Sequence, residues 1–190
     1  MRIGVYCGSF NPPHKGHIEI ADTCLKQNYV DKVLIIATGN YWHKQNLMPV
    51  QNRIEMLRNF ESENIIIDDK HNDIPYTYLI FRELREEYPD DELFLIIGGD
   101  NLPDFMAWSE YQELLQYVFL VIPRDEIQTP EIENIMNRMG KDNYEILDIP
   151  NIPICSTFIR NNMDDYSKIE DCLDKRVYDY LLEHDELDFD

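Results

Sequence analysis

The sequence predicts an α/β fold in which a parallel sheet is covered by helices on both faces. Short apolar runs alternate along the chain with segments whose apolar residues recur at helical spacing. The apolar runs are continuous, as in residues 33–38, which is typical of parallel strands buried on both sides. Gly8, Gly39 and Gly98 each come just after such a run. Ligands of these sheets bind beyond the carboxyl ends of the strands, so we expect a site where these glycines gather.

The N-terminal stretch is predicted to be a strand, a turn and a helix. Residues 3–6 form an apolar run, and Gly8 and Ser9 end it. Pro12 and Pro13 exclude a helix at that point, because proline lacks an N–H and restricts the residue before it. Apolar residues then recur at helical spacing, at Ile18, Ala21 and Leu25. A turn that leads into a helix N-terminus leaves backbone N–H groups free, which makes it a natural anion site.

The remaining elements follow in alternation. We expect further strands at residues 33–38, 65–67, 93–97, 118–122 and 144–149. We expect helices over residues 50–60, after the Ile74-Pro75 pair and ending near Pro89, over 108–117, over 132–139 and in the C-terminal part from about residue 156. Gly140 is expected to end the helix that precedes it. The chain has 190 residues, which suits one domain spanning 1–190.

Composition limits the classes of partner. The formal net charge of −20 argues against nucleic acid, since a phosphate backbone needs Lys and Arg. An acidic protein can still bind an anionic nucleotide, because screening leaves local donors to decide. The four cysteines form no CxxC pair, and no apolar run approaches the length that spans a membrane. With no signal peptide before the first strand, a reducing cytoplasm is the simplest expectation.

His14 and His17 are the first candidates for chemistry. At a spacing of three they can share one face of the helix that begins there. Such a pair can bind zinc, but no third ligand with zinc spacing lies nearby. Two uninvolved surface histidines are the other plain interpretation. Their place between a glycine-containing turn and a helix N-terminus favours contact with a phosphate group.

Three motifs together resemble one enzyme family. GSFNPPHKGH at residues 8–17 is similar to the signature of the HxGH nucleotidyltransferase superfamily. IGGDNLPDFMAW at 97–108 and ICSTFIR at 154–160 resemble segments of nicotinate (nicotinamide) mononucleotide adenylyltransferases. The resemblance implies a Rossmann-like doubly wound sheet. It also implies transfer of an adenylyl group from ATP to nicotinate mononucleotide, which gives deamido-NAD and pyrophosphate in NAD biosynthesis, with Mg2+ accompanying ATP.

The resemblance also assigns site residues. The catalytic residues that it implies are His14, His17, Lys44 and Arg160. The residues that it implies for ATP binding are Gly8, Ser9, Phe10, His14, Gly16, His17, Ser156, Thr157 and Arg160. Those that it implies for the pyridine mononucleotide are Lys44, Thr77, Gly99, Asp100 and Trp108. Each also has a plainer interpretation: for example, Lys44 as a solvated loop lysine, Trp108 as a core aromatic and Ser156 as a helix cap.

Two departures from the family pattern bear on the acceptor. Ile80 stands where the acid-using members carry a second threonine, and Cys155 stands where a serine is common. We expect nicotinate mononucleotide to be preferred, with the nicotinamide form as the alternative acceptor. Another HxGH nucleotidyltransferase, such as a phosphopantetheine adenylyltransferase, and a non-catalytic nucleotide-binding regulator are the rival classes. The sequence leaves a homo-oligomer open.

Overall fold

A parallel sheet forms the centre of the molecule. The computed structural model describes residues 1–39, 41, 46–124, 127–149 and 156–184. Within these residues six strands form one sheet in the order β3-β2-β1-β4-β5-β6, and every pairing is parallel. The strands are β1 (Arg2–Gly8), β2 (Lys32–Ala37), β3 (Ile65–Asp68), β4 (Glu92–Gly98), β5 (Val118–Ile122) and β6 (Tyr144–Ile146).

The direction in which the sheet grows reverses at β1. Val5 in the middle of β1 pairs with Leu34 of β2 on one side and Leu95 of β4 on the other. The chain therefore runs outward from β1 to β3 and then returns to place β4 against β1. In a doubly wound sheet, a crevice opens at this reversal, outside the carboxyl ends of the strands. The predicted fold class is confirmed.

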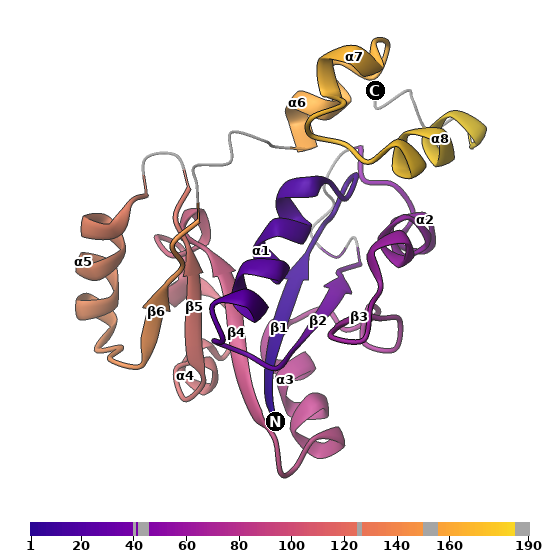
Figure 1. Cartoon of the computed structure of the whole chain (residues 1–190). Coiled ribbons are helices and arrows are strands. Elements are labelled where there is room, and N and C mark those ends of the chain that lie inside the picture. Colours follow the sequence, from indigo (N-terminus) through magenta and orange to yellow (C-terminus); the bar gives the residue numbers. More distant parts are fainter. Residues whose placement is uncertain (40, 42–45, 125–126, 150–155, 185–190) are drawn as a thin grey trace.

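Helices cover both faces of the sheet, as Figure 1 shows. One face is covered by α1 (Lys15–Lys26) and α2 (Val50–Leu57), which continues into the 3-10 turn η1 (Arg58–Phe60). The other face is covered by α3 (Thr77–Glu87), α4 (Tyr111–Leu114) and α5 (Thr129–Met139). Side chains alternate along each strand, so the same strand serves both layers: Tyr6 packs with α1, and Val5 packs with α3.

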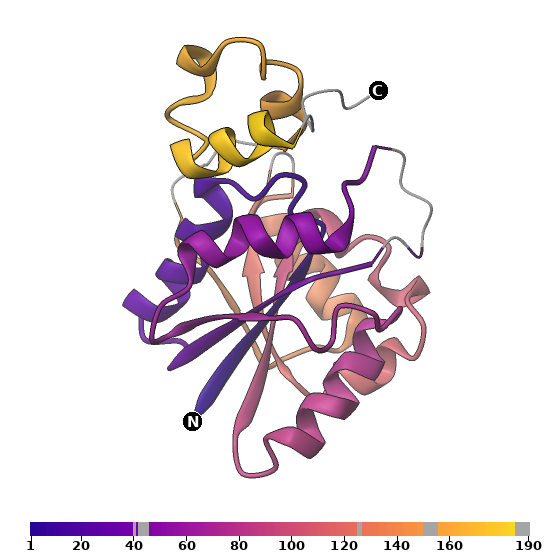
Figure 2. The same cartoon turned by 90° about the vertical axis from the view of Figure 1, so that its right-hand side faces the viewer.

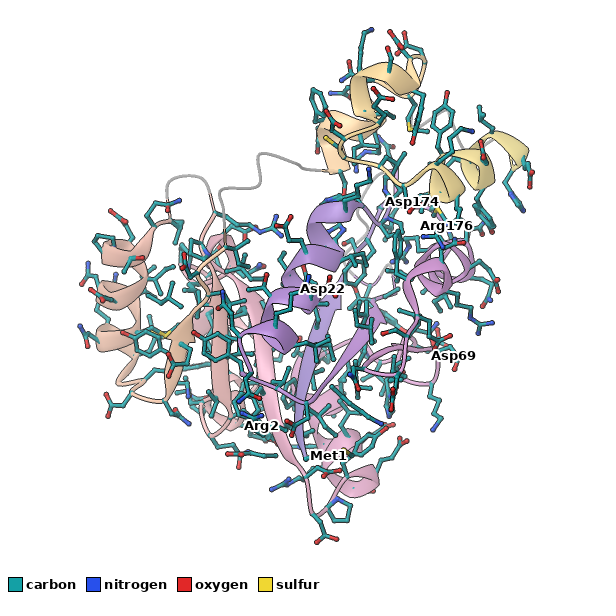
Figure 3. The ribbon with its side chains drawn as sticks, in the orientation of Figure 1. Met1, Arg2, Asp22, Asp69, Asp174 and Arg176 are labelled. Atoms are coloured by element: carbon teal, nitrogen blue, oxygen red, sulfur yellow. The ribbon has the colours of Figure 1, made fainter. Side chains whose placement is uncertain are left out.

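Three short helices close the chain above the carboxyl ends of the strands (Figures 1 and 2). They are α6 (Ser156–Arg160), α7 (Tyr166–Ile169) and α8 (Lys175–Glu183). They share a separate apolar cluster with α2, to which that helix contributes Met56. Figure 3 labels Arg176 at the start of α8, beside Asp174; its Nη1 also donates to the carbonyl of Asn59, 2.9 Å away. No helix in the described part of the chain is long and apolar enough to cross a bilayer.

Two predicted elements are shorter than expected. Of the helix predicted over residues 108–117, only Tyr111–Leu114 is helical, and Trp108 has an extended backbone with ψ 144°. Glu110 lies in the left-handed region at φ 49°, which interrupts a helix before it can start. The last strand ends at Ile146 rather than at residue 149. By contrast, α5 ends where predicted, with Gly140 at φ 65°.

A buried lysine ties the connection after α5 to the connection between α4 and β5. Lys141 is 2% exposed, and its ammonium donates to the carbonyls of Leu115 (2.9 Å) and Tyr117 (2.6 Å) and to the side chain of Asn143. The same ammonium lies 4.5 Å from the centre of the Phe119 ring. Burial lowers the pKa of Lys141 to about 8.

We expect Lys141→Met to lower the free energy of unfolding by about 2 kcal/mol, because it removes hydrogen bonds from a charged donor to two partly buried carbonyls. Urea unfolding followed by circular dichroism measures the change. Lys26→Met is the matched control, since Lys26 is exposed and forms only a surface ion pair with Asp22. Equal unfolding midpoints for the two variants would contradict the expectation.

Candidate active site

A cavity opens at the point where the sheet reverses. Its volume is about 650 Å³, which is within the usual range for small-molecule sites. The ends of β1, β4 and β5 form its floor, through residues such as Gly8, Gly98 and Ile122. Of the residues implied by the family resemblance, those that line it are Gly8, Ser9, Phe10, His17, Thr77, Asp100, Trp108 and Ser156.

The turn after β1 is shaped by Phe10. This residue lies in the left-handed region at φ 48°, and its ring is buried. The ring makes edge-to-face contacts with Tyr6, at 5.3 Å between centroids, and with His17, at 4.9 Å. A Cβ at position 8 would lie 3.0 Å from the Phe10 ring, so any larger residue than Gly8 would push the ring from its present place over the strand.

The two histidines are stacked at the start of α1. Their ring centroids lie 3.6 Å apart at an angle of 22°. The backbone N–H of His14 donates to Nδ1 of His17 over 3.2 Å. Because an amide N–H can only donate, Nδ1 of His17 is the acceptor and the proton of its neutral ring is on Nε2. A neutral His17 thus has one N–H donor to offer a ligand.

Both histidines are neutral at physiological pH. Burial, with a smaller effect of the Arg124 charge, lowers the pKa of His14 to about 3. Burial has the largest effect on His17 and holds its pKa well below the ordinary value; the neighbouring His14 and the Arg124 charge lower it further. Within the described residues Nδ1 of His14 is buried without a hydrogen-bond partner, a costly state that is typical of functional sites.

The low pKa of His14 makes stability depend on pH. Since its folded pKa of about 3 lies below the unfolded value of about 6.5, the unfolded chain binds more protons between these values. The free energy of unfolding therefore falls as pH is lowered through this window. Between pH 7.5 and pH 5 we expect His14 to account for about 2 kcal/mol of the loss. His14→Asn should lose less over the same range, as measured by urea unfolding; identical pH profiles would contradict this.

Helix α6 is fixed against the same turn although it is distant in sequence. Ser156 Oγ donates to the carbonyl of Pro12 over 3.3 Å. Arg160 Nη1 donates to the carbonyl of Asn11 over 2.7 Å, and its Nη2 donates to Thr157 Oγ1 over 3.1 Å. Ser156 lines the cavity, whereas Thr157 and Arg160 do not. The third motif thus meets the first at the carboxyl end of β1.

The opposite wall of the cavity combines aromatic and apolar side chains. Thr77, the first residue of α3, and Trp108 line it, together with the buried Ile80. The Trp108 ring is half-buried and lies 5.1 Å from the Phe105 ring beneath it. A planar ring can stack against such a wall, while Thr77 offers a hydroxyl. Ile80, which departs from the family pattern, therefore lines the same cavity as Thr77, which matches that pattern.

Gly98 and Gly99, the two glycines of the second motif, lie differently with respect to the cavity. Gly98 lines the cavity, and a Cβ there would collide with the carboxylate of Asp100. Gly99, which the resemblance assigns to substrate, is buried and is not part of the lining; a Cβ there would lie 3.1 Å from the carbonyl of Ile122. Gly98 thus makes room for Asp100, and Gly99 allows close packing on β5.

Other implied residues lie beside the cavity or outside the described ranges. His14 and Gly16 are buried in the first turn of α1, next to the lining but not part of it. Lys44, together with its neighbours Trp42 and His43, lies outside the described residues, as does Cys155. The sheet rule predicts that His14, Lys44, Asp100 and Ser156 converge on one rim; of these, Asp100 and Ser156 line the cavity, His14 is buried beside it, and Lys44 lies outside the described residues.

Arg124 is a lining residue to which the sequence analysis gave no role. Its Nε lies 3.8 Å from Asp100 Oδ1, and its charge contributes to the lowered pKa of both histidines. The signal that could have found it is its position two residues after the strand that ends at Ile122, where the sheet rule places ligand contacts. A half-buried guanidinium at this place suits a phosphate group.

A metal ion at this site would depend on the nucleotide for its ligands. In the described ranges no three His, Cys, Asp or Glu side chains are gathered in a way that could hold one. The half-exposed carboxylate of Asp100 is the acidic group on the cavity lining. Mg2+ commonly binds through one or two carboxylates, substrate phosphates and water, so these residues fit an ion carried by a triphosphate.

Comparison with known proteins defines the class. A family model described as cytidylyltransferase-like matches residues 5–162. This range contains the turn with the two histidines, the cavity walls and α6. The chain belongs to the cytidylyltransferase-like family, and the HxGH resemblance of its first motif is in agreement.

The relatives narrow the assignment to one group. A protein of Fusobacterium nucleatum named "Probable nicotinate-nucleotide adenylyltransferase" is 34% identical over 93% of this chain and 95% of its own length. A protein of Flavobacterium johnsoniae with the same name is 30% identical over 95% of this chain and 96% of its own. The predicted resemblance to this group is confirmed.

A solved structure confirms the fold independently. The Plasmodium falciparum nicotinic acid mononucleotide adenylyltransferase complexed with NaAD matches 100% of this chain and 98% of its own with a TM-score of 0.83. At 22% identity this likeness concerns the fold, including the C-terminal helices. The cavity described above therefore lies in a fold that is shared with this solved structure over the whole chain.

Proposed function

We propose that this protein transfers the adenylyl group of ATP to nicotinate mononucleotide, forming deamido-NAD and pyrophosphate. The observation that supports this most is the cavity at the sheet reversal, where the histidine turn, the Trp108 wall and the start of α6 meet. The names of the full-length relatives support the same reaction. We place ATP against the turn and α6, and the pyridine ring against Trp108.

The reaction needs alignment and charge stabilisation rather than a base. An oxygen of the mononucleotide 5′-phosphate bonds to the α-phosphorus of ATP, and the bond from that phosphorus to the pyrophosphate oxygen breaks. The attacking phosphate is already ionised near neutral pH, since its second pKa is about 6. In this proposal Nε2–H of His17 donates to an oxygen of the α-phosphate as charge shifts to the leaving group. Arg160 and Lys44 are proposed to contact phosphates, as the resemblance implies.

The preference for nicotinate rests on donors at the pyridine wall. The Thr77 hydroxyl lies at the N-terminal end of α3, where backbone N–H groups favour an anion. No lysine or arginine lies in residues 97–108, and the lining cation Arg124 already faces Asp100, so we propose that a carboxylate is recognised by hydrogen-bond donors. Ile80 lines the cavity but supplies no hydrogen-bond donor. Its presence would therefore reduce the preference for nicotinate mononucleotide over nicotinamide mononucleotide. The proposal also includes Mg2+ bound with ATP and a cytoplasmic site of action.

Turnover with purified components tests the proposal. Pyrophosphate release is measured with ATP, Mg2+ and either nicotinate or nicotinamide mononucleotide, and with phosphopantetheine as a third acceptor. We expect the highest kcat/KM with nicotinate mononucleotide. A higher kcat/KM for the amide would overturn the acceptor assignment and leave adenylyl transfer intact. Turnover with phosphopantetheine alone would indicate a different nucleotidyltransferase, and ATP binding without turnover of any acceptor would indicate a regulator.

A further inference from the structure

Arg53 of α2 is a charged side chain in the interior of the protein. It is 1% exposed, and its guanidinium donates to three backbone carbonyls. Nε donates to Met48 (2.9 Å), Nη1 to Ser9 (2.7 Å) and Nη2 to Thr38 (2.9 Å). No carboxylate of the described chain forms an ion pair with it. Burial lowers its pKa to about 10, so the group stays charged at neutral pH.

The three carbonyls belong to three different segments at the edge of the cavity. Ser9 is in the turn after β1, Thr38 follows β2, and Met48 precedes α2. Ser9 and Thr38 line the cavity. The fork of a guanidinium can bond several acceptors at once, which an ammonium on a flexible stem does less well. One side chain therefore fixes the relative positions of these three segments.

The bond to Ser9 has a direct consequence for the turn. The peptide between Ser9 and Phe10 is planar and trans, so the N–H of Phe10 points opposite to the Ser9 carbonyl, away from Arg53. The same peptide plane sets φ of Phe10, which is held at 48°. This left-handed conformation costs about 1–2 kcal/mol and persists only where surrounding contacts fix it. The Arg53 bond is such a contact.

A second side chain independently joins the turn to the segment before α2. Asn11 is buried; its Nδ2 donates to the carbonyl of Asn46 over 2.7 Å, and its Oδ1 accepts from the N–H of Met48 over 3.0 Å. The turn would therefore stay attached to the segment before α2 if the Arg53 fork were removed. Loss of the fork should release the Ser9–Phe10 peptide rather than unfold the region.

We propose that Arg53 is a positioning residue for ATP: it orients the Ser9–Phe10 peptide and so aligns the turn that binds the phosphates, without touching the nucleotide. This inference deepens the proposed function and rests on ATP binding at the turn. If Arg53 were purely structural, its loss would change the stability of the protein alone. A positioning role means that its loss also changes the affinity for ATP and the alignment of the phosphates.

Arg53→Met tests the inference, with Arg58→Met as the matched control. Methionine keeps an apolar stem in the interior and removes all three bonds. Arg58, five residues later, is exposed and pairs with Asp69 on the surface. The affinity for ATP is measured directly by calorimetry with Mg2+ present, alongside the unfolding temperature and kcat/KM. We expect Arg53→Met to weaken ATP binding about tenfold or more and to lower kcat/KM about a hundredfold. Arg58→Met should stay within about twofold of the wild type.

The conservative variant separates positioning from stability. Arg53→Lys keeps the charge and the stem, but all its donors are on one nitrogen, which cannot occupy the three positions from which Nε, Nη1 and Nη2 now reach the carbonyls. We expect it to recover most of the unfolding temperature and little of the ATP affinity. A folded Arg53→Met or Arg53→Lys protein with wild-type ATP affinity and kcat/KM would overturn the inference. So would equal losses in the Arg58 control. If wild-type protein binds ATP but does not use nicotinate mononucleotide, the proposed acceptor fails while the affinity comparison still decides the role of Arg53.

Discussion

Replacing His17 by alanine is expected to lower kcat about a hundredfold or more while the protein stays folded. His17 is the histidine that lines the cavity, and its neutral ring has its proton on Nε2 because Nδ1 accepts from the backbone of His14. That single N–H is fixed in direction by the stack on His14 and by the edge of Phe10. A fixed donor stabilises charge without reorganisation, so its loss affects the transition state more than ATP binding.

The measurement is pyrophosphate release at saturating ATP, with folding checked by circular dichroism. His184→Ala is the matched control, because His184 is an exposed histidine at the end of α8 that stacks on Tyr180 and does not line the cavity. We expect it to leave turnover unchanged. His17→Asn should recover part of the rate, since an amide can offer an N–H from a similar position. Wild-type turnover by a folded His17→Ala protein would remove the histidine from the mechanism.

The sequence alone predicted the strands and helices whose ends are marked by residues within the element or next to it. Strand β4 is a continuous apolar run that ends at a glycine pair, and α5 combines helical spacing with a glycine stop. The segment after Phe105 was predicted wrongly because its apolar residues also recur at helical spacing. In the structure those residues pack in one cluster around Phe105, but without a continuous helix, because Trp108 has an extended backbone and Glu110 takes a left-handed conformation. A periodic pattern does not reveal such a break.

The sequence predicted those residues of the site that follow directly after a strand or belong to a recognisable motif. The turn at Gly8 follows a strand, and so does Asp100, so the sheet rule alone brings them to one edge. Arg53 could not be found in this way. It lies in an amphipathic helix among Ile54 and Leu57, where an arginine is usually solvated. Its partners are backbone carbonyls of three separate segments, and backbone acceptors leave no trace in a sequence.

Removal of Mg2+ is expected to abolish turnover, lowering it about a hundredfold or more, and to do so reversibly. The attacking phosphate and the triphosphate are both anionic, and the chain that receives them has a net charge of −20. Burial keeps the two histidines neutral, so they supply donors and not positive charge. Arg124 is a cation on the described lining, and it already faces Asp100. We therefore expect the charge that develops on the leaving pyrophosphate to be stabilised by a divalent ion carried by the phosphates themselves.

The test is pyrophosphate release by protein passed through EDTA, followed by titration with Mg2+, together with elemental analysis of the purified protein. We expect no stoichiometric zinc, full loss of turnover in the chelator and full recovery with Mg2+. Asp100→Asn should raise the Mg2+ concentration needed for half-maximal rate if the Asp100 carboxylate reaches water bound to the ion. Ala107 is a neighbour on the lining without a ligand atom in its side chain, and Ala107→Gly, which adds none, serves as the control. Turnover that persists in EDTA would contradict the role of the ion. Tightly bound zinc, whose loss abolishes activity that Mg2+ cannot restore, would instead show that HxxH at the start of α1 is a metal site.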